Sequence, residues 1–135
     1  MKIINSIIII SIFLLVSACN KQDNKKSSIY ANYITQNNLE STNKITAFRF
    51  QGWHALDNKH LIISSNHNKS YLIGLDFYCS DLRHAINIVL DQTMSSSLSA
   101  KFDSIIVPLN PKIKCRIKSI HQISKDQKNQ LNALR

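Results

Sequence analysis

The stretch FYCSDLRHA, residues 77–85, decides the fold, because a hydrophobic strand ends there and a helix is expected to begin. Ser80 is a suitable N-cap, and Asp81 would place a negative charge in the first turn of that helix. The i, i+3, i+4, i+7 spacing of one helix face is filled by Leu82, Ala85, Ile86 and Val89. The pattern predicts a helix from about Asp81 to about Leu90.

Further along the chain, basic and apolar residues alternate strictly. The basic positions are Lys112, Lys114, Arg116 and Lys118, and the apolar positions are Ile113, Cys115 and Ile117. A period of two predicts a half-buried strand, which we expect to run from Lys112 to Ile123 with a bulge near Ser119-Ile120. Cys115 would then lie on its inward face.

A helix that begins at Cys79 and packs on this sheet could bring Cys79 to Cys115. We therefore predict a Cys79–Cys115 disulfide, which would close a loop of about 37 residues and restrict the unfolded chain. Two buried free thiols are the alternative, because spacing alone does not establish the geometry of a bridge.

The N-terminal residues predict an exported protein. Lys2 precedes an apolar run from Ile7 to Val16, which is the length of a signal-peptide core and too short to span a bilayer. The run ends in LVSAC, residues 15–19, which looks like the lipobox of bacterial lipoproteins. That resemblance implies a lipid, such as diacylglyceryl and palmitate, on Cys19. An ordinary signal peptide cut after Ala18 is the alternative.

These features divide the chain into three parts. Residues 1–18 are the expected signal peptide, residues 19–43 the lipidated cysteine with a flexible tether, and residues 44–135 a single small domain. Residues 20–28 are polar and without periodicity, so they predict a coil that spans roughly 18 Å. Ile29-Tyr30 and Tyr33-Ile34 favour a short helix or turn docked on the domain, or a contact with another chain. Asn20 after the cysteine points to the outer membrane, facing the periplasm.

The remaining elements predict an α+β domain with an antiparallel sheet of five to six strands, one central helix and a short C-terminal helix. A meander of three strands is expected over 45–50, 60–65 and 71–77, with a bulge at Gly52-Trp53. Another short strand is expected at 105–107. A capping box at Ser124–Gln127 would open the C-terminal helix.

The folded part also resembles a family of small exported proteobacterial proteins, catalogued as domain of unknown function 6491. The resemblance covers about Thr46 to Leu131 and lies in these segments: Ala47-Phe48-Arg49, Tyr71-Leu72, Cys79-Ser80-Asp81-Leu82 with Ala85, Phe102-Asp103-Ser104-Ile105, and Cys115-Arg116-Ile117 with Ile120. The family pairs a cysteine at the helix start with one in the late strand. It implies no activity.

No catalytic or cofactor motif is recognisable in the sequence, and we predict no metal site. The five histidines lack metal-ligand spacing, although His60 and His67 flank one turn. An enzyme, such as a hydrolase, would need a site assembled from Asp81, His84 and Asp103 without a motif. We expect Asp81 to act as a helix-terminal charge and Asp103 to cap a turn instead. A small apolar ligand between sheet and helix is a third hypothesis.

The basic excess is the unusual feature of the composition. The whole chain has a net charge of +9, and removal of residues 1–18 takes away only Lys2. The ladder of Lys112, Lys114, Arg116 and Lys118 predicts either a solvated face that resists aggregation or a contact with anionic lipid.

We expect a membrane-tethered, non-catalytic interaction or structural module of the cell envelope. Its partners would be the membrane and an envelope protein, and not nucleic acid.

Overall fold

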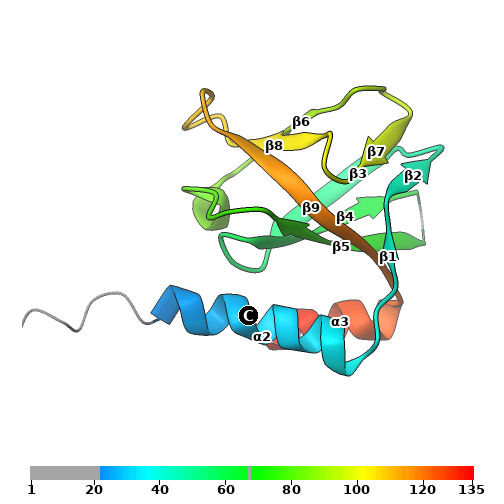
Figure 1. Ribbon diagram of the computed structural model, residues 1–135, viewed down its shortest axis with the longest axis vertical. Helices are drawn as coiled ribbons and strands as arrows, with labels where there is room; N and C mark the ends of the chain where they lie inside the picture. Colours follow the sequence, from blue (N-terminus) through cyan, green and yellow to red (C-terminus); the bar gives the residue numbers. More distant parts are fainter. Residues whose placement is uncertain (1–21, 67) are drawn as a thin grey trace, which may run out of the picture.

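The computed structural model describes residues 22–66 and 68–135, so the lipobox at residues 15–19 lies outside the described part (Figure 1). The elements in chain order are α2 (Gln22–Gln36), β1 (Ser41–Thr42), β2 (Lys44–Thr46), β3 (Phe50–Ala55), β4 (His60–Ser65), β5 (Lys69–Leu75), the 3-10 helix η2 (Leu82–His84), β6 (Val89–Asp91), β7 (Ser97–Ser99), β8 (Ser104–Ile106), β9 (Lys114–Ile123) and α3 (Lys125–Ala133). Among the described residues, no helix is long and apolar enough to cross a membrane.

The strands of the described chain form one large curled sheet and one small one. The large sheet has the order β3-β4-β5-β9-β8-β6, and β1 pairs with β9 beside this path. A separate pair joins β2 to β7. Each of these pairings is antiparallel. The strands β4 and β5 correspond to the second and third strands of the predicted meander, while its first strand lies later in the chain, at β3. The predicted class, α+β with an antiparallel sheet, is therefore confirmed.

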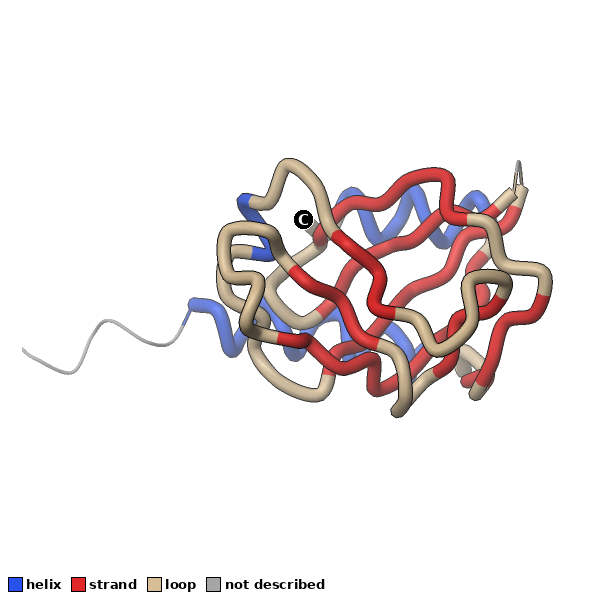
Figure 2. Tube along the Cα trace, turned by 90° about the horizontal axis from the view of Figure 1, so that it is seen from above, coloured by secondary structure: helices blue, strands red, loops and turns tan. Residues whose placement is uncertain are grey.

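The core lies on both faces of the large sheet. One face buries Leu61 and Ile63 with Ile73 and Ile105, where the sheet curls over itself. The other face buries Ile62 and Leu72 beneath α2 and α3, and seven residues form this second cluster: Tyr30, Tyr33, Leu56, Ile62, Leu72, Ile123 and Leu131. Figures 1 and 2 show the two helices together against this face. Because both faces are covered, β4 carries the continuous apolar run 61–63.

The helix predicted from Asp81 to Leu90 is wrong. Asp81 has a φ of 62°, in the left-handed region, and only Leu82–His84 form one turn of 3-10 helix. Val89–Asp91 is strand β6, which pairs with Ser104–Ile106. Of the predicted apolar stripe, Leu82 is buried while Ile86 is 98% exposed. The ladder hydrogen bonds of β6 and the left-handed residue therefore override the helical spacing.

The predicted strand over residues 45–50 is interrupted. Strand β2 ends at Thr46, and Ala47 has a φ of 53°. The Phe48 N–H donates to the Ser96 carbonyl at 2.9 Å, and β3 begins at Phe50. The bulge predicted at Gly52-Trp53 lies between Phe50 and Gly52, where the register with β4 shifts.

The flexible tether predicted over residues 20–28 is also wrong from Gln22 onward. Helix α2 begins at Gln22 and includes the expected helical segment 29–34. Tyr30 and Tyr33 are buried, and the Tyr33 hydroxyl donates to Gln130 Oε1 on α3 at 2.6 Å. The Ser124–Gln127 capping box that opens α3 is confirmed, with both reciprocal hydrogen bonds present.

Candidate functional site

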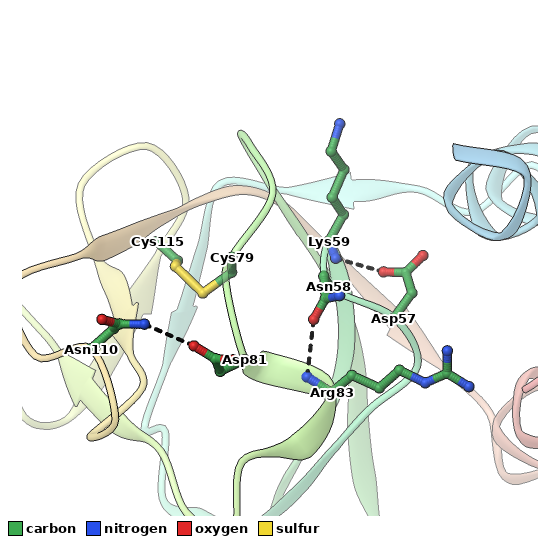
Figure 3. Close-up of a disulfide and its surroundings, with 8 residues drawn as sticks. All are labelled: Asp57, Asn58, Lys59, Cys79, Asp81, Arg83, Asn110 and Cys115. Carbon is green, nitrogen blue, oxygen red and sulfur yellow. Dashed lines mark hydrogen bonds between the residues drawn. A yellow bond between two sulfur atoms is a disulfide. The ribbon is translucent and has the colours of Figure 1, made fainter. Parts of the chain in front are cut away.

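The disulfide Cys79–Cys115 is present and confirms the prediction (Figure 3). The two Cα atoms are 5.7 Å apart, and both residues are 1% exposed. Cys79 follows the end of β5, and Cys115 is the second residue of β9, so the bond extends the β5–β9 pairing beyond its last registered pair, Leu75 and Ile117. It therefore closes the sheet at this end rather than tying a helix to it.

Asn58 holds the chain around the disulfide in place. Its backbone carbonyl accepts from the Cys79 N–H at 2.8 Å, and its side-chain oxygen accepts from the Arg83 N–H at 3.1 Å. Figure 3 shows Asn58, in the turn between β3 and β4, with its side chain directed toward the backbone of Arg83. The irregular segment 76–88 thus has hydrogen-bond partners that substitute for those of a regular helix.

The three candidate catalytic residues do not form a site. Asp81 lies on the surface, where it accepts from Asn110 Nδ2 at 2.8 Å, and His84 is exposed. Asp103 is fully buried and accepts from the Thr93 N–H, the Thr93 hydroxyl and the Ser99 N–H at 2.7–2.8 Å. Among the described residues, the one hydrogen bond between members of the three is the backbone bond from the His84 N–H to the Asp81 carbonyl at 3.0 Å, and no side-chain hydrogen bond joins them. Asp103 acts as an acceptor that fixes two loops.

The basic ladder on β9 is exposed but partly neutralised. Lys114 forms an ion pair with Asp91 at 2.8 Å, and Arg116 Nε lies 4.0 Å from Asp76 Oδ2. Lys112 and Lys118 have no carboxylate within 4.0 Å in the described part of the chain. The ladder therefore carries less uncompensated charge than the sequence suggests.

The histidines are spread over the fold. His54 contacts Asn132 of α3, His121 Nδ1 contacts the Leu39 and Glu40 carbonyls, and His67 lies outside the described residues. Among residues 22–66 and 68–135, no group of three His, Cys, Asp or Glu side chains is placed to hold a metal ion.

A buried cluster beneath α2 was not found from the sequence. The His60 Nδ1 lies 3.1 Å from both carboxylate oxygens of Asp57, whose Oδ1 also accepts from the Lys59 N–H at 2.6 Å. The Tyr30 ring lies 5.5 Å from the His60 ring, and the Tyr30 hydroxyl has no hydrogen-bond partner among the described residues. Burial, and then the nearby Asp57 carboxylate, raise the pKa of Tyr30.

A basic pocket at the opposite end of the sheet was also missed. It has a volume of about 450 Å³ and is lined by Lys69, Lys125, Lys128, Ser64 and Ser70, with no acidic residue. Lys128 Nζ donates to Ser64 Oγ at 3.1 Å and to Ser70 Oγ at 3.4 Å. The two serines are cross-strand partners in the β4–β5 hairpin. The hairpin is recognisable in the sequence, but the docking of α3 that brings Lys128 to it is not.

Together these features define a small α+β domain closed by a disulfide, with a basic pocket at the far end. The chain belongs to the Family of unknown function (DUF6491), whose model matches residues 1–135. Comparisons with curated proteins and with solved structures found no match.

Proposed function

We propose that this chain is a lipoprotein of the bacterial cell envelope, whose folded domain is a non-catalytic interaction module on the periplasmic side of the outer membrane. The observation that carries the proposal is the Cys79–Cys115 disulfide, which is typical of an oxidising compartment such as the periplasm. It accounts for two of the three cysteines and leaves Cys19, at the end of LVSAC, for the lipid.

The absence of a catalytic role is supported by what the candidate groups do. The carboxylate of Asp103 is occupied by three hydrogen bonds that hold the loops at Thr93 and Ser99, and Asp81 is paired with Asn110 at the surface. Binding through a surface remains as the simplest role for such a domain.

Metabolic labelling tests the anchor. The full chain, expressed in bacteria, should incorporate labelled palmitate and fractionate with membranes, because the lipobox directs acylation of Cys19. The Cys19→Ala variant should be unlabelled and soluble, whereas Cys79→Ala, the matched control, should keep the label. A wild-type protein without label would refute the lipoprotein proposal. A crosslinking pull-down from intact cells then identifies the protein partner.

A second candidate function is the binding of a small anionic ligand, and the basic pocket favours it. Two serine hydroxyls fix the Lys128 ammonium, and Lys69 and Lys125 line the same pocket. Ammonium and hydroxyl donors without a competing carboxylate suit phosphate or carboxylate groups. The predicted apolar ligand between sheet and helix is not favoured, since α2 and α3 pack directly on the sheet.

Titration with inorganic phosphate and with succinate, followed by NMR, tests the second function. Saturable shifts should appear at Ser64, Ser70 and the pocket lysines, and Lys128→Met should abolish them. Lys118→Met, which removes a lysine from the β9 ladder, should leave them unchanged. Linear shifts spread over all lysines would refute a specific pocket.

A further inference from the structure

Six strand ends of the described chain meet at one end of the molecule. In the antiparallel pairings, β3 ends and β4 begins near the Ala55–Leu61 pair, β5 ends and β9 begins near the Leu75–Ile117 pair, and β8 ends where β6 and β9 begin. The loops 57–59, 76–88 and 107–113 therefore lie together, next to the Cys79–Cys115 bond. We call these loops the disulfide end. Figure 1 places η2, drawn in green, and the loop between β8 and β9 at this end.

Exposed apolar side chains are concentrated at the disulfide end. Six of the ten large hydrophobic residues that are exposed in the described chain lie there or on the adjoining first residue of β6: Phe77, Tyr78, Ile86, Val89, Leu109 and Ile113. Ile86 is 98% exposed and Leu109 is 70% exposed. Contact of apolar side chains with water is unfavourable, and burying them would stabilise the protein. A cluster of exposed apolar residues is therefore typical of a surface that binds a partner or a membrane.

Basic side chains lie around this apolar cluster. Lys59, Arg83 and Lys112 belong to the three loops, while Lys114 and Arg116 lie at the start of β9. The acidic groups at the same end are Asp76 and Asp91, which pair with Arg116 and Lys114, Asp81, which is bonded to Asn110, and the buried Asp57. Apolar residues with a slight basic excess are typical of an interfacial membrane contact rather than of purely electrostatic binding.

Helix α2 runs toward the disulfide end. Tyr30 contacts His60 at the start of β4, whereas residues 39–40, beyond the other end of the helix, contact His121 in the second half of β9. The first turn of α2 therefore reaches past His60, and Figure 1 shows it at the same end of the molecule as η2. Only Asn20 and Lys21 separate Gln22 from Cys19, a span of at most about 11 Å for three Cα–Cα steps.

We propose that the disulfide end rests on the bilayer that holds the lipid of Cys19, with Ile86 and Leu109 inserted among the phospholipid headgroups. The inference rests on the proposed lipoprotein function, since the short link from Cys19 brings this end to the bilayer. The basic pocket at the opposite end then faces away from the membrane.

Native lysines report this orientation. Lipidated full-length protein is reconstituted into vesicles of phosphatidylethanolamine and phosphatidylglycerol, and acetylation of each lysine is measured by mass spectrometry against the soluble Cys19→Ala protein. Acetylation of Lys59 and Lys112 should be slowed several-fold in vesicles, while Lys69 and Lys125 should react at unchanged rates. The double variant Ile86→Asp, Leu109→Asp should lose this protection. The control variant Phe102→Asp removes an exposed apolar residue that precedes β8, away from the disulfide end, and should retain the protection of Lys59 and Lys112.

The outcomes separate the two proposals. If the wild type carries no lipid and does not sediment with vesicles, the lipoprotein proposal fails. If it sediments but Lys59 and Lys112 react as fast as in solution, the docking proposal alone is refuted. Equal slowing of lysines at both ends would also refute it. The substituted positions are exposed, and a circular dichroism spectrum and urea midpoint equal to those of the wild type show that each variant is folded.

Discussion

Reduction of the Cys79–Cys115 bond should lower the free energy of unfolding by about 4 kcal/mol. The two cysteines are 36 positions apart, so the closed loop holds 37 residues, and the chain-entropy relation gives about 4 kcal/mol at room temperature for that length. The effect arises mainly in the unfolded chain, which gains conformational freedom when the loop opens.

The native structure offers little to replace the bond. Of the four apolar residues at helical spacing in this region, only Leu82 is fully buried, and Ile86 and Val89 face solvent. Outside the disulfide, segment 76–88 is joined to the rest of the fold by the Asn58 hydrogen bonds to Cys79 and Arg83, the Asp76–Arg116 backbone bond and the Asn110–Asp81 bond. We therefore expect amide hydrogen exchange to accelerate in this segment upon reduction, beyond the change in the β4–β5 hairpin.

Urea unfolding of the soluble Cys19→Ala protein, with and without reductant, measures the effect without changing a side chain in the core. The Cys79→Ala, Cys115→Ala double variant should be at least as destabilised as the reduced protein, and Cys79→Ala alone should be about as destabilised as the double variant. A reduction effect below about 1 kcal/mol, at an unchanged native structure, would refute the loop-closure reasoning.

Three further substitutions test individual groups by urea unfolding. Asp103→Ala should cost about 3 kcal/mol, because it removes the buried acceptor of three hydrogen bonds, from the Thr93 N–H, the Thr93 hydroxyl and the Ser99 N–H; a cost below about 1 kcal/mol would contradict this role. Tyr30→Phe should leave stability unchanged or raise it by about 1 kcal/mol, since the buried hydroxyl has no partner among the described residues; a clear loss would mean that a buried water binds the hydroxyl. Ser124→Ala should cost about 1 kcal/mol through loss of the α3 cap, and an unchanged stability would show that packing alone fixes the start of α3.

Local patterns predicted the elements that local chemistry controls. The strand over 60–65 has the predicted bounds, and the Ser124–Gln127 capping box is formed as its spacing indicates. The bulge expected near Ser119-Ile120 is present one residue earlier, where β5 and β9 shift register around Lys118. The capping box carries its own hydrogen bonds within four residues, whereas the strand and the bulge bond to other strands, and only their alternating pattern is local.

Non-local contacts decided the segments that were predicted wrongly. Residues 82–89 have helical spacing, yet Val89–Asp91 pairs with β8 and Asp81 adopts a left-handed turn. The polar segment that begins at Gln22 lacks an amphipathic signal, yet it forms helix α2, whose later residues Tyr30 and Tyr33 bury against the sheet. The basic pocket needs α3 to bring Lys128 to the β4–β5 hairpin.

The sequence by itself determined the α+β class, the disulfide pair and the alternating strand that carries Cys115, because periodicity and cysteine number are properties of the chain. The tertiary structure alone decided which residues share the disulfide end. That end is assembled from loops at 57–59, 76–88 and 107–113. In the sequence, Ile86 and Val89 fit the apolar face of a helix and Leu109 lies in a loop, so nothing there indicates that they are exposed at the same end of the fold. Their common location follows from the antiparallel register that places six strand ends of the described chain together, and register is set by contacts between distant parts of the chain.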